Sequence, residues 1–156
     1  GACVGGGTGI AAACDIVIAS EDAFFSIAEV RWGLHAGPIL PQLAAAMGTR
    51  NLRRYAITGE RFDAPTAQAL GLVHEVCATG ELDAAAVPVI DSILKNGPNA
   101  IADTKQIIFD TSNLAIDDDL ALELARDHAR KRRTDEAAEG LRSFKEKRNA
   151  QWYLGS

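Results

Sequence analysis

The pattern of apolar and polar positions changes near residue 80. Before it, short apolar runs alternate with glycine-containing turns and short helical stretches, which is typical of buried strands in an α/β fold. The predicted strands cover residues 2–4, 15–20, 23–27 and 72–77, and the predicted helices cover residues 8–14, 41–47, 51–57 and 64–70. Asp63 is a plausible N-cap of the last of these helices, and Gly71 is its stop.

After residue 80 the pattern predicts helices only. They cover residues 82–94, 100–109 and 120–132, followed by a last helix that Thr134 can cap. Asn96, Gly97 and Pro98 form a turn signal between the first two of these helices. With this turn as the boundary, we expect two regions, residues 1–96, which hold all the predicted strands, and residues 97–156, which hold helices alone.

A run of three glycines, Gly5 to Gly7, stands between the first predicted strand and the first predicted helix. Glycine is used where the backbone must approach a ligand closely or adopt dihedral angles closed to other residues. The first amides of a helix lack partners and carry partial positive charge, so they suit an anion or a polarised carbonyl. The glycines alone leave two interpretations open, a plain tight turn and a binding turn.

Glu29 is a lone carboxylate among apolar neighbours, between Ala28 and Val30 and close to Trp32. Such an acid is either a solvated residue at the rim of the fold or a carboxylate whose proton affinity is raised by desolvation. The residues around it do not decide between these two interpretations.

Composition narrows the function classes. The chain has 156 residues, of which 47% are hydrophobic, and a formal net charge of −5. The charge argues against nucleic acid as a partner, and no apolar run reaches the length of about 18 residues that spans a membrane. Three widely spaced cysteines, Cys3, Cys14 and Cys77, are interpreted as small buried thiols without a metal or disulfide role. We expect no metal site and a cytoplasmic location.

The succession of motifs resembles the C-terminal part of the crotonase superfamily, the enoyl-CoA hydratase/isomerase proteins. The resemblance covers essentially the whole chain in one order. It implies an α/β fold, a crotonase-like spiral of ββα turns in residues 1–96, followed by a helical C-terminal trimerisation region in residues 97–156. It also implies further ββα turns before residue 1. The matching motifs are GACVGGG at 1–7, CDIVIA at 14–19, EVRWGL at 29–34, TGERFDA at 58–64, ALGLVHEV at 69–76 and SFKEKR at 143–148.

The resemblance implies a catalytic role for Gly6 and Glu29. The amide of Gly6 would be one of two backbone donors that stabilise the enolate oxygen of an acyl-CoA thioester. Hydratases of this family hold water between two glutamates; the second falls on Glu29, but the first falls on Gly9, which has no carboxylate. A carboxylate restored at Gly9 would test whether the pocket is otherwise ordinary.

Three functions remain after this substitution. The first is a lyase reaction, hydration of an enoyl-CoA with Glu29 as the sole protein acid and base. The segments 26–34 and 53–64 look most like bacterial hydratases of branched glutaconyl-CoA thioesters, which act in leucine or acyclic terpene breakdown. The second is a double-bond isomerase that needs one glutamate, and the third is a non-catalytic acyl-CoA-binding relative.

The resemblance also implies substrate-binding positions and partners. Arg31 or His35 could hold the carboxylate of a glutaconyl substrate, although an isolated histidine in a loop is more often simply exposed. Gly37 matches a glycine whose amide positions water, or it is a plain turn glycine. No cofactor is expected, because coenzyme A is part of the substrate, and a homotrimer or dimer of trimers is the expected assembly. The full set of expected substrate-binding residues is Gly5, Gly9, Gly37, Arg31, His35, Phe144 and Lys147, the last two reaching the coenzyme A of a neighbouring subunit.

Overall fold

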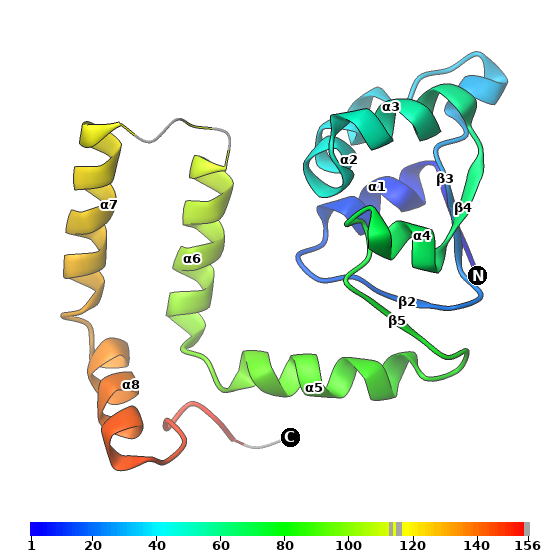
Figure 1. Cartoon of the computed structure of the whole chain (residues 1–156). Helices are drawn as coiled ribbons and strands as arrows, with labels where there is room; N and C mark the ends of the chain where they lie inside the picture. Colours follow the sequence, from blue (N-terminus) through cyan, green and yellow to red (C-terminus); the bar gives the residue numbers. More distant parts are fainter. Residues whose placement is uncertain (113, 115–116, 155–156) are drawn as a thin grey trace. The chain divides into compact units, whose positions relative to one another are not determined.

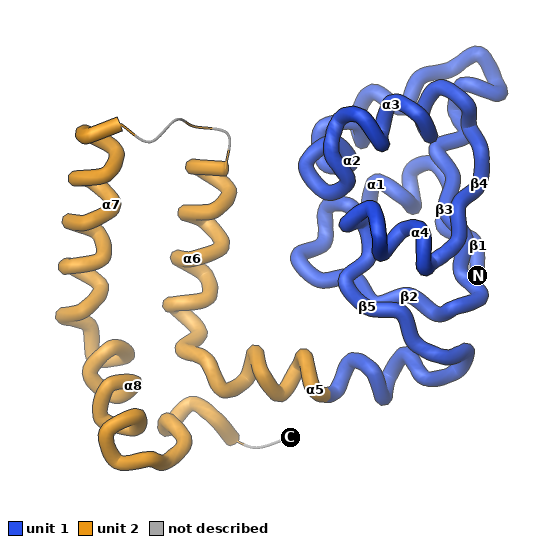
Figure 2. The backbone as a smooth tube through the Cα atoms, in the orientation of Figure 1, with its two compact units in different colours: residues 1–87 blue, residues 88–156 orange. Residues whose placement is uncertain are grey.

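The structure, a computed structural model, describes residues 1–112, 114 and 117–154. The chain divides into two compact units, Gly1–Val87 and Pro88–Ser156 (Figure 2). The division falls inside helix α5 (Leu82–Leu94), at Pro88. Proline has no amide hydrogen for the helix ladder, so this residue interrupts the hydrogen bonding of α5. The boundary expected at residue 96, and a trimerisation role for residues 97–156, stay predictions.

The first unit contains two small sheets (Figure 1). In the three-stranded sheet, β1 runs parallel to β3 and β3 runs antiparallel to β4, in the order β1-β3-β4. The other sheet pairs β2 with β5 in parallel. The strands are β1 (Ala2–Val4), β2 (Ile18–Ser20), β3 (Phe24–Ser26), β4 (Arg61–Asp63) and β5 (Glu75–Cys77).

Helices of the first unit pack around these strands, and α1 packs against α2. The Asp63 side chain accepts a hydrogen bond from the Thr66 amide at 2.9 Å, which confirms the predicted N-cap. Tight 3₁₀ turns at Glu29–Trp32 and Gly37–Ile39 connect β3 to α2. The helices are α1 (Gly6–Ala13), α2 (Leu40–Met47), α3 (Thr49–Thr58) and α4 (Ala64–Ala69).

The core of the first unit lies between the three-stranded sheet and these helices. Phe25 and Phe62 face each other across β3 and β4, with ring centroids 5.6 Å apart, and Tyr55 of α3 lies 4.3 Å from the Phe62 ring. Leu43 of α2 and Ile27 are fully buried in the same cluster. This core fixes β3, and therefore the start of the turn that carries Glu29.

Two sequence expectations need correction. Strand β4 was not predicted, because three residues with one apolar position give no readable alternation. The interpretation of all three cysteines as buried thiols is wrong for Cys14, which is exposed just after α1. Cys3 and Cys77 are half-buried, and burial raises the pKa of the Cys3 thiol.

The second unit contains only helices among its described residues, as the periodicity predicted (Figure 1). Thr134 caps the last helix by accepting a hydrogen bond from the Ala137 amide at 3.2 Å, which confirms the predicted cap. No helix in the described part of the chain is both long and apolar enough to cross a membrane. The helices are the end of α5, α6 (Pro98–Thr111), α7 (Asp118–Lys131) and α8 (Asp135–Glu146).

Candidate active site

The glycine turn is held in place by the sheet beside it. Gly5 adopts φ 56° and ψ −123°, a conformation that only glycine takes without strain. Its amide donates to the Ser26 carbonyl of β3 at 2.9 Å. The fully buried Thr8 hydroxyl donates to the Cys3 carbonyl at 2.9 Å, so the first turn of α1 is tied to β1 as well.

The amide of Gly6 is available at the start of α1. Gly6 is the first residue of the helix and is exposed. The amides of Thr8 and Gly9 both donate to the Gly5 carbonyl, whereas the Gly6 amide has no acceptor among the described residues. An unpaired amide at a helix N-terminus carries partial positive charge and can donate to an oxygen that gains negative charge.

The Glu29 carboxylate lies directly against this turn. The end of β3 and the 3₁₀ turn Glu29–Trp32 bring its Oε1 within 3.1 Å of the point where a side chain at Gly5 would begin. Its Oε2 is buried and has no hydrogen-bond partner among the described residues. The Glu29 residue as a whole is half-buried, and only its Oε2 atom is shielded from solvent.

The position expected for a second acid is filled by a neighbouring side chain. A β-carbon built on Gly9 would lie 2.2 Å from Ile39 Cγ2 and 2.5 Å from Ile39 Cβ. Ile39 ends the 3₁₀ turn Gly37–Ile39, and its Cβ is fixed to the backbone, so rotation of the side chain cannot relieve the second contact. A carboxylate side chain at Gly9 would therefore overlap Ile39 in the present arrangement.

Arg31, His35 and Gly37 follow Glu29 along the same loop. The Arg31 Nε donates to the Gly59 carbonyl at 3.1 Å, which ties the loop to the end of α3. The Gly37 amide donates to His35 Nδ1 at 3.2 Å, so this amide already has an acceptor. The proposed contact of Gly37 with water stays a prediction, and it would require His35 to move.

Phe144 and Lys147 lie at the end of α8 in the second unit. The Phe144 side chain is 84% exposed, and Lys147 follows it with φ 52°, its amide donating to the Phe144 carbonyl at 3.2 Å. The expected contact of Phe144 and Lys147 with coenzyme A stays a prediction.

A family model for enoyl-CoA hydratase/isomerase matches residues 1–154. The chain belongs to this family. A mevalonyl-coenzyme A hydratase of Aspergillus fumigatus is 33% identical over 154 residues, which is 97% of this chain and 57% of that protein. A peroxisomal Delta(3,5)-Delta(2,4)-dienoyl-CoA isomerase of Arabidopsis thaliana is 36% identical over 122 residues, 77% of this chain and 44% of that protein.

Solved structures of the family confirm the expected fold. An enoyl-CoA hydratase from Shewanella pealeana superposes with a TM-score of 0.92 at 41% identity, over 97% of this chain and 57% of that one. Pseudomonas aeruginosa AtuE superposes with a TM-score of 0.94 at 32% identity, over 99% of this chain and 60% of that one. The chain thus has the fold of part of a crotonase domain and spans under two thirds of these relatives.

The sequence alone did not reveal the residues that hold the glycine turn and fill the space beside Gly9. Thr8 and Ser26 hold the turn through buried hydrogen bonds, and Ile39 closes the space beside Gly9. The threonine directly after the three glycines could have suggested a side-chain hydrogen bond from α1 to a neighbouring strand. Nothing local to Ile39 indicates its contact, because its partner lies on a different helix.

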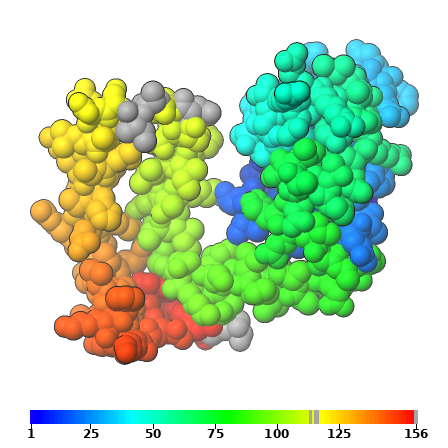
Figure 3. Space-filling model, viewed as in Figure 1, coloured from blue at the N-terminus to red at the C-terminus, as the bar shows by residue number. Residues whose placement is uncertain are grey.

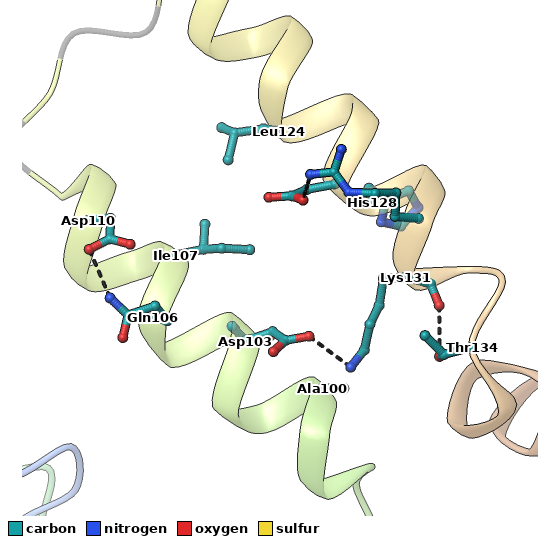
Figure 4. A pocket seen from close by; sticks show the side chains of 12 residues that line it. Ala100, Asp103, Gln106, Ile107, Asp110, Leu124, His128, Lys131 and Thr134 are labelled. Atoms are coloured by element: carbon teal, nitrogen blue, oxygen red, sulfur yellow. Dashed lines mark hydrogen bonds and ion pairs between the residues drawn. The ribbon is translucent and has the colours of Figure 1, made fainter.

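Two cavities in the described residues lie away from this site. The larger, of about 850 Å³, lies between α6 and α7 in the second unit, and Figure 3 shows this face of the molecule. Its lining includes Lys131, whose Nζ lies 2.8 Å from an Asp103 oxygen (Figure 4). The smaller, of about 360 Å³, lies in the first unit beside Cys14 and His74. Neither is lined by Glu29 or the glycine turn.

Proposed function

We propose that the whole protein is a lyase that adds water across the α,β double bond of an enoyl-CoA thioester, with Glu29 as its only side-chain acid and base. The observation that carries this proposal is the contact of Glu29 with Gly5, the residue before Gly6. Neither the buried Oε2 of Glu29 nor the Gly6 amide has a hydrogen-bond partner among the described residues. A proton-transfer group and an oxyanion donor are the two functions that the reaction requires.

The reaction balances with one carboxylate. Glu29 takes a proton from water while the water oxygen bonds to Cβ, and the double-bond electrons move onto the thioester oxygen. The Gly6 amide donates to that enolate oxygen. The protonated Glu29 then returns its proton to Cα, the carbonyl re-forms, and the net change is the addition of one water molecule.

We propose a branched acyl chain with its own carboxylate, of the glutaconyl type, as the substrate class. His35 supports this choice, because Nδ1 accepts from the Gly37 amide and a neutral ring then carries its proton on Nε2. That N–H could donate to a substrate carboxylate. The Nε of Arg31 is engaged with Gly59, so this guanidinium would act through its terminal nitrogens.

The test is hydration of 3-methylglutaconyl-CoA by the full-length protein and by its Glu29→Gln variant. We expect turnover to fall by about 10²- to 10⁴-fold in the variant, the contribution typical of one general acid or base. Glu75→Gln is the matched control, since Glu75 is exposed on β5, and its rate should equal the wild-type rate. Wild-type turnover in Glu29→Gln would reject the proposal.

An isomerase is the second candidate, and the contact between Gly9 and Ile39 favours it. A double-bond shift needs one carboxylate that removes a proton from one carbon and returns it to another, without water. Turnover in H₂¹⁸O separates the two reactions, because hydration places one ¹⁸O in the product and isomerisation places none. Coenzyme A binding with neither reaction would instead indicate the non-catalytic acyl-CoA-binding relative.

We also propose that the whole protein assembles as a homotrimer or a dimer of trimers. The support is the exposed apolar surface of the second unit, since large exposed apolar patches mark interaction sites. The exposed apolar side chains there include Ile90, Ile108, Phe109, Leu122, Leu141 and Phe144.

A further inference from the structure

We propose that Ile39 is a specificity-determining residue, because its side chain restricts this site to one acid and makes the wall beside Gly9 apolar. The inference rests on the proposed function of Glu29. It goes beyond that function by naming the residue that selects among substrates.

The contact between Gly9 and Ile39 carries the inference. Both the Cβ and the Cγ2 of Ile39 lie within 2.5 Å of the point where a Gly9 side chain would begin. Gly9 itself is buried, and Ile39 packs against the core of the first unit. The space is therefore occupied by hydrocarbon rather than left open for solvent.

The contact between Gly9 and Ile39 lies one turn along α1 from the contact between Gly5 and Glu29. Gly5 and Gly9 are four residues apart, so they lie on the same side of the first turn of α1, about 6 Å apart along its axis. Glu29 Oε1 lies against Gly5, and Ile39 lies against Gly9. A carboxylate on Gly9 would stand one turn from Glu29, where Ile39 now stands.

The chemical consequence concerns the attacking water. Two carboxylates can hold a water between them, but methyl and methylene groups offer it no hydrogen bond. A water activated by Glu29 must then take its second hydrogen bond from the substrate or the loop around His35. A substrate that carries a carboxylate can provide that bond, whereas a plain straight-chain enoyl group cannot.

The experiment compares hydration of crotonyl-CoA, which has no acyl carboxylate, with that of 3-methylglutaconyl-CoA. The full-length wild-type protein is tested beside Gly9→Glu, Ile39→Ala and the double variant Gly9→Glu/Ile39→Gly, because only glycine at position 39 also removes the Cβ that lies 2.5 Å from a side chain at Gly9. Leu70→Ala is the matched control, because Leu70 is also half-buried and packs on the same core. Thermal unfolding and coenzyme A binding establish which variants are folded.

We expect crotonyl-CoA hydration to rise by about 10²-fold or more in the double variant, the contribution of a second acid or base. Gly9→Glu alone should gain nothing, since Ile39 occupies the space. An equal gain in Gly9→Glu alone, or no gain in a folded double variant, would overturn the assignment of Ile39.

Ile39→Ala alone keeps the inference testable if the double variant does not fold. Removing the branched side chain opens room for water, so the ratio of crotonyl-CoA to 3-methylglutaconyl-CoA hydration should rise, while Leu70→Ala leaves the ratio unchanged. An unchanged ratio in Ile39→Ala would overturn the inference. Failure of the proposed function would give a different result from failure of the Ile39 inference, since the wild type would then be inactive or Glu29→Gln would remain active.

Discussion

The first unit encloses a core of apolar side chains from every one of its layers, whereas the described part of the second unit, Pro88–Ser156, buries only Ser143 and Ala150. Its helices instead present large apolar side chains to solvent, such as Phe109, which is 79% exposed. Burial of apolar surface is the dominant stabilising contribution in folding. The first unit therefore has a core that can hold its site in place, whereas the described part of the second unit gains little stability from buried apolar side chains.

Polar contacts hold the second unit together in place of a core. The Glu136 carboxylate accepts from the amides of Asn99 and Ala100 at 2.9 and 2.8 Å, and so joins α8 to the start of α6. The Glu139 carboxylate pairs with Arg148 and also accepts from the Gln151 amide. The two units therefore differ in what holds them together, an apolar core in the first and polar contacts in the second.

The largest effect on stability should come from the core of the first unit. Leu43→Ala removes a fully buried side chain from α2 and should lower the free energy of unfolding by about 2–5 kcal/mol. Urea denaturation measures this change. A loss below about 0.5 kcal/mol, the range of a surface substitution, would show that the core does not stabilise the unit as described.

A smaller loss of stability with a large loss of activity is expected for Gly5→Ala. The positive φ at Gly5 should cost about 1–3 kcal/mol, and the new methyl group would press on Glu29 Oε1 at 3.1 Å. Gly48→Ala is the matched control, since Gly48 has φ 74° and ψ 148° but no atom within 4 Å. Both variants should be destabilised, but only Gly5→Ala should lose turnover.

Low pH should reduce the stability of the second unit, because it protonates carboxylates that the folded unit holds in their charged form. Burial alone would raise the pKa of Glu136, but the Asn99 and Ala100 amides and the Lys131 charge outweigh burial and lower the pKa. The Arg148 guanidinium lowers the pKa of Glu139. Because both pKa values lie below the ordinary value of 4.5, the stabilisation is present above that pH and is lost as pH falls through the lowered values.

Thermal unfolding between about pH 7 and about pH 3 checks this direction. Glu136→Gln should make the acid-induced loss shallower, whereas Glu123→Gln, an exposed change on α7, should leave the curve as it is. A Glu136→Gln protein with the wild-type pH profile would contradict the role given to this carboxylate.

The smallest effect on the free energy of unfolding is expected at the exposed surface of the second unit. Phe109→Ser should change the stability of the dissociated chain by less than about 0.5 kcal/mol. If the apolar surface is covered in a trimer, the same change should weaken assembly, which sedimentation velocity measures. A large loss of stability in the dissociated chain would mean that Phe109 packs within its own unit.

Features with local signals were predictable from the sequence, and features made by distant contacts were not. The caps at Asp63 and Thr134 were predicted because a capping side chain and its amide are neighbours in sequence. Strand β4 exists because Phe62 packs against Phe25, which is far away along the chain.

The candidate site divides in the same way. The glycine turn and Glu29 could be identified from motifs, but their contact depends on the pairing of β1 with β3. The absence of an acid at Gly9 was readable in the sequence. The contact of Ile39 with Gly9 was not, because it depends on how α1 packs against the turn before α2.

The most direct test of the central claim is exchange of the α-protons of butyryl-CoA with D₂O, followed by NMR. This saturated thioester can be neither hydrated nor isomerised, so exchange reports only proton removal by the carboxylate and enolate stabilisation by the glycine turn. We expect exchange by the full-length protein, a loss of about 10²-fold or more in Glu29→Gln, and no change in Glu75→Gln. Exchange at the wild-type rate in Glu29→Gln would contradict the account.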